Sequence, residues 1–281
     1  TGIELRNYER EVRFYQQIRD TVHIRTPHCW YAEWDPESGD FTLLLEDLAP
    51  AVQGDQVAGC SLDHARLGIV ELAKLHAPRW GDPGLDDIEW LSRRGAESGP
   101  QLQALYAMVF PGFVETYGPR LTAEQVALAE RFTEKIPAWI AMHHPPFCVT
   151  HGDYRLDNMM FGTEQGGYPV AVVDWQTPGH GSGSADLSYF IGAGLLPHDR
   201  RTHERDLVAE YHGAMLVEGV TDLTFDDLWD DYVRDSFAGV VMAVVASMIV
   251  GKSERSEDMF HAMAERHLQH ALDLDALSMI P

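Results

Sequence analysis

Residues 151–158 read His-Gly-Asp-Tyr-Arg-Leu-Asp-Asn, and Asp174 follows sixteen residues later at the end of an apolar run. The stretch places an aspartate, Asp153, and an asparagine five residues on, Asn158, in one short loop. The run Val170–Val173 has the composition of a buried strand, so a hairpin can return Asp174 to the same place. The three side chains are therefore expected to share one pocket.

These residue types are the ones that phosphoryl transfer from a nucleotide requires. One carboxylate, here Asp153, orients the acceptor hydroxyl and takes its proton late in the transfer. An amide oxygen and a second carboxylate, here Asn158 and Asp174, hold magnesium, which prefers hard oxygen ligands. The structural alternatives are a turn-capping aspartate, a turn asparagine and a strand-ending aspartate. We favour the catalytic interpretation because all three positions are filled together.

The composition excludes several other classes of protein. The 281 residues are 45% hydrophobic, which is enough for a large core in one domain or two lobes. A balance of 21 basic against 44 acidic residues gives a net charge of −23, which argues against nucleic acid and anionic membranes as partners. The charge is compatible with a cationic substrate, although a solvated acidic surface is the simpler explanation.

Neither a membrane segment nor a signal peptide is expected. The longest apolar run, residues 237–250, falls short of the ~20 residues of a membrane span and is interpreted as a buried helix. Residues 1–20 are rich in charge, unlike a signal peptide. The three cysteines, Cys29, Cys60 and Cys148, are far apart and odd in number, which predicts a reducing, cytoplasmic compartment without a disulfide framework.

Periodicity predicts a small part with strands followed by a mostly helical part. A helix is expected over residues 3–19, then a hairpin of strands Cys29–Trp34 and Phe41–Leu45 around a turn rich in Asp, Pro and Gly. Ser61 is the expected N-cap of the next helix. The remaining expected elements are helices at about 101–110 (ended or kinked by Pro111), 122–143 (with a Thr122/Gln125 capping box), 186–195, 199–218, 225–250 and 256–277, and strands at 147–150, 159–161 and 170–174.

Together these elements predict an α+β, two-lobed architecture. Residues 1–50 would form a truncated N-lobe, with short antiparallel strands and one helix. Residues 51–281 would form a helical C-lobe that carries the loop and the substrate pocket. A nucleotide would lie in the cleft between the lobes.

In the order and spacing of its motifs, the chain resembles the aminoglycoside phosphotransferases and choline kinases of the protein-kinase-like fold. More narrowly, it resembles the ecdysteroid kinase-like proteins. The resemblance implies ATP- and Mg²⁺-dependent phosphorylation of a small-molecule hydroxyl, on an aminoglycoside-, choline- or steroid-alcohol-like acceptor. The matching segments lie in the family's order: Tyr8–Tyr15, Leu43–Leu48, Ala73–Ala77, His151–Asn158, Val173–Gln176 and Asp186–Tyr189.

The resemblance also implies roles for residues outside the loop. Glu11 would pair with the ATP-binding lysine, and the backbone of Glu46 to Leu48 would bind adenine as the hinge. Arg155 stands where many protein kinases place a lysine that reaches the transferred phosphate, and its guanidinium offers two donors. Asp186 would brace the catalytic loop. A solvated helical glutamate and a surface arginine are the alternatives for Glu11 and Arg155.

Two features of the family are missing from this sequence. It has no Gly-rich strand-turn-strand, and no lysine precedes Glu11, since the only lysines are Lys74, Lys135 and Lys252. The expectation is a fragment whose upstream strands are not in this sequence. The alternative is a degraded kinase, a pseudokinase-type protein that binds a nucleotide or metabolite without transferring phosphate. The eleven residues between Asp174 and Asp186 are too few for the regulated segment of a protein kinase.

Two further interpretations stay open. A metal-dependent hydrolase could use Asp153, Asp174 and His151, and it would consume substrate without ATP. The aromatic and acidic residues 229–235 could bind an ammonium group, because aromatic faces and carboxylates attract cations. The same residues also suit the core and the start of a helix, where acids favour the macrodipole, and we prefer that interpretation. The oligomeric state does not follow from the sequence.

Overall fold

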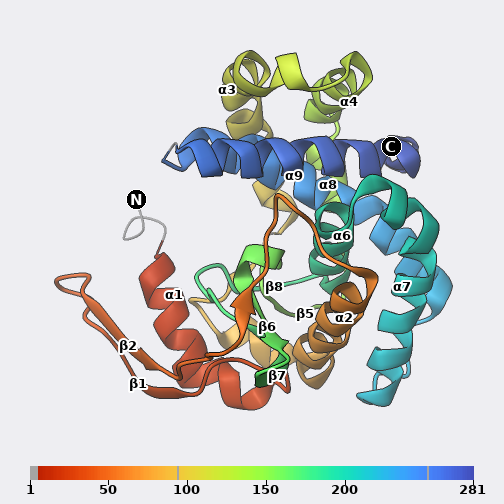
Figure 1. Ribbon diagram of the computed structural model, residues 1–281. Helices are drawn as coiled ribbons and strands as arrows, with labels where there is room; N and C mark the ends of the chain where they lie inside the picture. The colour runs from red at the N-terminus through yellow and green to blue at the C-terminus, as the bar shows by residue number, and fades with distance from the viewer. Residues whose placement is uncertain (1–5, 94, 252) are drawn as a thin grey trace.

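The computed structural model describes residues 6–93, 95–251 and 253–281 (Figure 1). The first described element is α1 (Asn7–Arg13), which continues as a π-helical turn, Phe14–Ile18, and a 3₁₀ turn, Arg19–Thr21. The helix predicted over residues 3–19 is therefore confirmed from Asn7 onward, and residues 3–5 of that prediction lie outside the described residues.

The predicted N-terminal hairpin is present with the predicted bounds. β1 (Cys29–Trp34) and β2 (Phe41–Leu45) pair antiparallel. The turn between them is closed by the carboxylate of Asp35, which accepts hydrogen bonds of 2.8 and 3.0 Å from within the turn. α1 packs on this hairpin, and the ring of Tyr8 stacks on Phe41 with centroids 4.4 Å apart. Figure 1 shows the hairpin and α1 together at one corner of the molecule.

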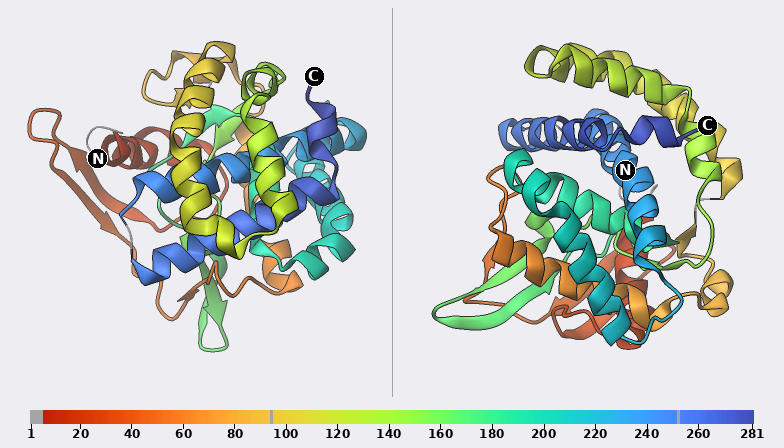
Figure 2. Two further views of the ribbon diagram at one scale, coloured as in Figure 1. Left: turned by 90° about the horizontal axis from the view of Figure 1, so that it is seen from above. Right: turned by 90° about the vertical axis from the view of Figure 1, so that its right-hand side faces the viewer.

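Two small three-stranded sheets surround the 151–158 loop. One has the order β3–β6–β7 and the other β4–β8–β5. Their strands are β3 (Val52–Gln53), β4 (Ser92–Arg93), β5 (Cys148–Thr150), β6 (Met159–Thr163), β7 (Gly166–Val172) and β8 (Gly179–Gly181). β3, β4 and β8 were not predicted, because strands of two or three residues are too short to show alternation. Both views in Figure 2 show the β6–β7 hairpin projecting from the body of the molecule.

The predicted end of β7 is wrong by two residues. The strand stops at Val172, not at Asp174. Asp174 has a φ of 64°, in the left-handed region, and this conformation cannot continue an extended strand. The chain therefore turns sharply at the residue that the sequence analysis singled out.

The rest of the chain is mostly helical, and its predicted caps are confirmed. The Ser61 hydroxyl accepts a 3.2 Å hydrogen bond from the His64 N–H, and Thr122 with Gln125 forms a complete capping box. The helices are α2 (Leu62–His76), α3 (Gly99–Tyr117), α4 (Ala123–Thr133), α5 (Ile136–Ala141), α6 (Gly183–Gly194), α7 (Pro197–Val217), α8 (Phe225–Ile249) and α9 (Glu254–Asp273).

Several helix boundaries differ from the prediction: α6 begins three residues earlier, at Gly183, α9 ends at Asp273 and not at 277, and two further differences occur at prolines. α3 does not end at Pro111 but continues through it to Tyr117. A proline removes one backbone hydrogen bond, and here the helix is held by Phe113 and Tyr117, which are buried in the core. The helix predicted over 122–143 is two helices, because Pro137 lies in the first turn of α5, where a proline starts a helix but cannot continue the preceding one.

α8 is the central helix of the C-terminal part. By length and composition it could cross a membrane, but 67% of its most apolar window is buried inside the protein. It packs against α3, α6 and α9, and it contains the run predicted as a buried helix over 237–250 as far as Ile249. Ile249 and Val250, at the end of that run, are exposed. Figure 1 shows α9 lying across the top of α6 and α8, with α3 and α4 on its outer side. This packing brings the N-terminal turns of α9 close to the 151–158 loop.

Candidate active site

The second residue of the 151–158 loop, Gly152, must be a glycine. The loop leaves β5 at Thr150, and Gly152 has a φ of 79°. A Cβ atom at Gly152 would lie 2.3 Å from the Thr177 carbonyl oxygen. The left-handed conformation and this close approach both exclude a larger residue, so the loop is shaped at its second residue.

Asp186 braces the loop from below, as the sequence predicted. Its carboxylate is buried in the first turn of α6 and accepts hydrogen bonds from the backbone N–H groups of His151 (2.6 Å) and Gly152 (3.0 Å). The Nε2 atom of His76 lies 3.4 Å away and its Nδ1 atom bonds the Tyr211 hydroxyl at 2.7 Å. Burial opposes ionisation of Asp186, but the hydrogen bond and charge of His76 and the loop N–H groups lower its pKa overall.

The carboxylate of Asp153 accepts hydrogen bonds from three side chains. The Nε atom of Arg155 bonds both oxygens, at 3.1 and 3.0 Å. The hydroxyl of Tyr189 donates to Oδ1 at 2.8 Å, and the amide of Asn158 donates to Oδ2 at 3.1 Å. The side chain of Asp153 remains 22% exposed, so it is oriented by the protein and still accessible. Tyr189 had no predicted role, although it ends the Asp186–Tyr189 segment that carried part of the resemblance.

Asn158 and Asp174, the predicted magnesium ligands, lie beside Asp153. Asn158 is buried, its amide nitrogen bonds both the backbone carbonyl and the carboxylate of Asp153, and its own backbone carbonyl accepts a 2.9 Å bond from Val173. With its nitrogen turned to Asp153, the side-chain oxygen of Asn158 is the atom that remains for a cation. Burial and the nearby charge of Asp153 raise the pKa of Asp174. The structure thus brings the three predicted residues together.

Glu11 is buried on α1, next to the segment that follows Asp174. Burial, and then the charge of Asp174, raise its pKa to about 7, although the Trp175 N–H and the Gln176 side chain bond it. The ring of Phe14 stacks on Trp175, with centroids 3.8 Å apart, and fastens α1 to this segment. Glu11 therefore lies in the site as predicted and is not the solvated helical glutamate of the alternative.

Neither lysine that the structure describes, Lys74 or Lys135, pairs with Glu11. Lys74 pairs with Glu71 on α2 at 2.6 Å, and Lys135 bonds the carbonyl oxygens of Ile280 and Pro281. Among residues 6–93, 95–251 and 253–281, these two lysines are thus both used elsewhere. Lys252 lies outside the described residues.

Glu46 and Leu48, the predicted hinge, follow β2 directly. The Glu46 carboxylate accepts hydrogen bonds from Arg25 (2.5 Å) and from the His28 N–H (2.9 Å), and its own N–H continues the pairing to the His28 carbonyl. The Leu48 carbonyl accepts a 2.9 Å bond from the Ala51 N–H. The side chain and the N–H of Glu46 and the carbonyl of Leu48 are thus already engaged, so the adenine contact that the resemblance implies would have to come from other backbone groups of residues 46–48.

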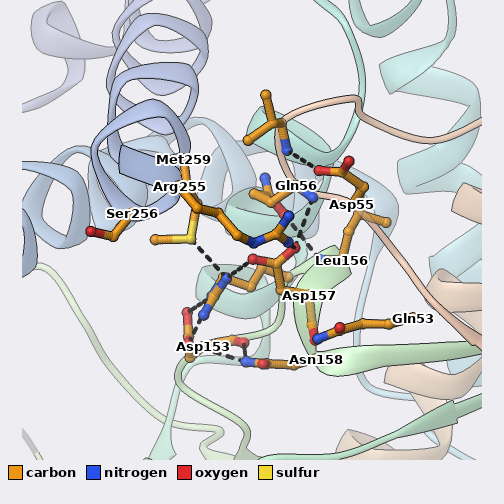
Figure 3. A network of polar contacts seen from close by, with 12 residues as sticks. Gln53, Asp55, Gln56, Asp153, Leu156, Asp157, Asn158, Arg255, Ser256 and Met259 are labelled. Carbon is orange, nitrogen blue, oxygen red and sulfur yellow. Dashed lines mark hydrogen bonds and ion pairs between the residues drawn. The ribbon is translucent and has the colours of Figure 1, made fainter. Parts of the chain in front are cut away.

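A charged network at the mouth of the site was not predicted (Figure 3). Arg155 bonds Asp157 at 2.7 Å as well as Asp153, and it contacts the sulfur of Met259 on α9 at 3.1 Å. Arg255, also on α9, lies 3.3 Å from Asp157 and is 62% exposed. Burial opposes the charge on Arg155, but the two aspartates raise its pKa above the ordinary value. Arg155, with a 17% exposed side chain, is therefore a largely buried ion-pair partner and not a surface arginine.

Asp157 also joins the loop to the segment between β3 and α2. Its carboxylate accepts a 2.9 Å hydrogen bond from the Gln56 N–H, and its carbonyl accepts a 2.6 Å bond from the Gln53 side chain. The Gln56 side chain in turn accepts a bond from the Leu156 N–H at 2.9 Å. Figure 3 shows these residues converging from three parts of the chain on one aspartate. Separations of about a hundred residues gave the sequence analysis no signal for this contact.

Residues 229–235, the alternative cation-binding stretch, lie in the first turns of α8. Tyr232 is fully buried, and Asp235 is buried in ion pairs with Arg234 and His143, as the core interpretation predicted. A cavity of about 440 Å³ does occur at this end of α8, with acidic and apolar walls. It is lined by Trp80, Met142, His144, Pro146, Ser182, Ser184, Tyr211, Asp222, Leu223, Asp227, Leu228, Asp230, Asp231, Arg234 and Met279.

Part of the chain matches known proteins in sequence. The model of the ecdysteroid kinase-like family matches residues 101–225. A mouse protein, acyl-CoA dehydrogenase family member 10, is 27% identical over 155 residues, and the match spans 47% of this chain but only 14% of that protein.

Solved structures match over nearly the whole chain. A Ralstonia eutropha protein assigned as an aminoglycoside phosphotransferase is 17% identical, with 97% of this chain and 84% of that one covered and a TM-score of 0.57. A choline/ethanolamine kinase family protein from Mesorhizobium loti is 16% identical, with 98% and 82% covered and a TM-score of 0.56. The resemblance inferred from the sequence is therefore confirmed: the chain has the protein-kinase-like fold of these small-molecule kinases, and its residues 101–225 match the ecdysteroid kinase-like family.

Proposed function

We propose that the protein is an ATP- and Mg²⁺-dependent phosphotransferase that acts on a hydroxyl group of a small molecule. The observation that carries this proposal is the contact between Asp153 and Asn158, at 3.1 Å, on a loop braced by Asp186 and beside Asp174. It is the arrangement in which one carboxylate receives the acceptor hydroxyl while an amide and a second carboxylate hold the metal. The small-molecule kinases with the same fold support a kinase of this class.

The residues present fit a divalent cation. Asp153, Asp174 and Glu11 place three carboxylates near one another in a partly buried site. Burial first, and then the charge of a neighbouring aspartate, raise the pKa values of Asp174 and Glu11, and a cation would relieve both effects. Asn158 and Asp174 would hold the cation, with the remaining positions filled by phosphate oxygens and water. Magnesium bound there would neutralise the charge of the triphosphate. A related aminoglycoside 2'-phosphotransferase was solved with GDP, so GTP belongs in any test of the donor.

The protein's own groups would then act in sequence on the acceptor. Asp153 accepts a hydrogen bond from the acceptor hydroxyl and receives its proton late in the transfer. Arg155 now bonds both oxygens of Asp153, so it must release at least one before a hydroxyl can bind there. We propose that Arg155 moves to the transferred phosphoryl group, which its planar guanidinium can bind with two hydrogen bonds.

The acceptor class is the least constrained part of the proposal. Choline, ethanolamine and aminoglycosides appear in the names of the related kinases, and the net charge of −23 is compatible with a cationic acceptor. We therefore propose an amino alcohol or amino sugar, made in or taken into a reducing, cytoplasmic compartment, where the three free cysteines stay reduced. Better turnover of neutral alcohols than of amines would contradict the cationic acceptor.

A pseudokinase-type binding protein is the second candidate. The binding-protein candidate is favoured by the partners of Glu11. Among the residues that the structure describes, Glu11 bonds the Trp175 N–H and the Gln176 side chain and no lysine. A metal-dependent hydrolase is less well supported, because the solved structures that share the fold are small-molecule kinases.

The test is release of ADP or GDP in the presence of Mg²⁺ and a panel of amino sugars, choline-like amines and neutral alcohols. We expect acceptor-dependent release by the wild-type protein, and a loss of roughly 10²- to 10⁴-fold in Asp153→Asn, the usual contribution of a general base. Nucleotide affinity, measured by calorimetry, should be retained in the variant. Nucleotide binding without release in the wild type would support the binding protein, and near-normal turnover in Asp153→Asn would refute the assigned role.

A further inference from the structure

Tyr189 contacts the proposed catalytic carboxylate although it lies 36 residues away on α6. Its side chain is 5% exposed, and its hydroxyl donates to Oδ1 of Asp153 at 2.8 Å. We infer that Tyr189, seated against His267, is a positioning residue that holds the Asp153 carboxylate in the orientation that receives the acceptor hydroxyl. The inference rests on the proposed phosphotransferase function.

Tyr189 is the donor to Asp153 best suited to stay in place throughout a turnover. Arg155 is proposed to move to the phosphoryl group, and the side chain of Asn158 is proposed to hold the metal. Both tasks can shift these side chains when the nucleotide binds. Tyr189 is attached to a buried helix that also carries the loop brace Asp186, so its hydroxyl and the loop share one rigid support. Burial raises the pKa of the Tyr189 phenol well above its ordinary value, so it remains a donor.

His267 on α9 fixes the ring of Tyr189. The two rings are parallel within 9°, with centroids 5.1 Å apart. His267 is fully buried, and within the described ranges neither ring nitrogen has a hydrogen-bond partner. Burial lowers its pKa far below the ordinary value, so the ring is neutral and acts as a flat packing surface.

Two glycines, on α8 and α6, make room for the His267 ring. A Cβ atom at Gly239 would lie 2.1 Å from the ring, and one at Gly192 on α6 would lie 3.0 Å from it. The ring therefore fills space between α6, α8 and α9 that the two glycines leave open. The packing of the helical core thus sets the position of Tyr189, and its hydroxyl carries that position to the Asp153 carboxylate.

The decisive variant is Tyr189→Phe, with Tyr106→Phe as the matched control. Tyr106 is also fully buried and donates one hydrogen bond, to the Ala129 carbonyl at 3.1 Å, in a part of the core between α3 and α4. Both variants lose one buried hydroxyl, so a merely structural effect should be similar in the two.

We expect Tyr189→Phe to lower kcat by roughly 10- to 100-fold, because a small misplacement of a reacting group has effects of this size. The KM for the nucleotide should not change. The number of nucleotides hydrolysed per acceptor phosphorylated should rise, since a misplaced carboxylate activates the hydroxyl less well while the nucleotide site is intact. Unfolding of part of the sample would lower kcat without changing this ratio.

His267 provides a second, independent test. His267→Phe should keep the flat surface and nearly wild-type kcat, whereas His267→Ala should lower kcat. The double variant Tyr189→Phe/His267→Ala should be no worse than Tyr189→Phe alone, because both changes act through one hydroxyl.

The outcomes separate this inference from the function on which it rests. Acceptor phosphorylation by the wild type together with an unchanged kcat and hydrolysis ratio in Tyr189→Phe would overturn the positioning role and leave the proposed function intact. Equal losses in Tyr189→Phe and Tyr106→Phe would also overturn it. A wild-type protein that binds nucleotide but phosphorylates no acceptor would overturn both.

Discussion

Replacement of Asp186 by Asn tests the central support of the site with almost no change of shape. The carboxylate is 4% exposed and accepts hydrogen bonds from the N–H groups of His151 (2.6 Å) and Gly152 (3.0 Å) through different oxygens. An asparagine can offer an oxygen to only one of them and must turn its own NH₂ toward the other.

The expected loss of stability is the sum of two effects. A hydrogen bond to a charged group contributes about 1.5–3 kcal/mol, and a buried donor left without a partner costs about 1–3 kcal/mol. We therefore expect Asp186→Asn to lower the free energy of unfolding by about 2.5–6 kcal/mol. Since a typical domain has only about 5–15 kcal/mol of stability, the change should be large in any unfolding experiment.

The effect should depend on pH in a defined direction. The pKa of Asp186 is lowered in the folded protein, although burial alone would raise it, because His76 and the loop N–H groups favour the carboxylate. A carboxylate with a lowered folded-state pKa stabilises the protein above its unfolded-state pKa of about 4, and this stabilisation is lost as the pH falls through the folded-state value. The gap between wild type and Asp186→Asn should thus be widest at neutral pH and narrow below about pH 4.

Urea unfolding at pH 7 and at pH 3.5, followed by circular dichroism, measures this gap directly. Asp206→Asn, an exposed position on α7, is the control and should lie within about 0.5 kcal/mol of the wild type at both pH values. A loss below about 1 kcal/mol in Asp186→Asn at pH 7, or a gap that does not narrow in acid, would refute the reasoning.

Three further predictions concern the same site. Gly152→Ala should lower the free energy of unfolding in urea by more than about 2 kcal/mol, because φ is 79° and the new Cβ would lie 2.3 Å from a backbone oxygen. The control Gly213→Ala, on a helix with nothing within 4 Å of the new Cβ, should be neutral or stabilising by up to about 1 kcal/mol. Equal effects of the two changes would contradict this prediction. Glu11 has a raised pKa of about 7, so it stabilises the folded protein fully below about pH 4.5, and this contribution is lost as the pH rises through 7. Glu11→Gln should therefore remove about 2–3 kcal/mol of the change in unfolding free energy between about pH 4.5 and pH 8. Parallel plots of unfolding free energy against pH for the wild type and the variant would disprove this. Arg155→Met should lower the stability of the folded protein by about 3 kcal/mol or more, because it leaves the carboxylates of Asp153 and Asp157 without their largely buried partner. Arg255→Met, at a 62% exposed side chain, should lower it by less than about 1 kcal/mol. Thermal unfolding that ranks the two variants the other way would contradict this assignment of the ion pairs.

The sequence by itself determined the elements whose information is local. The β1–β2 hairpin has the predicted bounds because alternating apolar residues and the turn chemistry of Asp35 lie within a few residues of one another. The caps at Ser61 and Thr122 were predicted for the same reason. The order and spacing of Asp153, Asn158 and Asp174 also indicated the fold, since a loop and one hairpin can bring these three residues together without knowledge of the rest of the chain.

The tertiary structure alone decided how these residues are held. Tyr189 meets Asp153 because α6 packs under the loop and α9 presses His267 against it, and no periodicity encodes a contact between those helices. Asp157 is reached from residues about a hundred positions away. The left-handed turn at Asp174 ended β7 two residues early, because backbone geometry at one residue overrides an apolar run. Patterns in sequence record which face of an element is buried, but the partner on that face is chosen only when all the elements pack together.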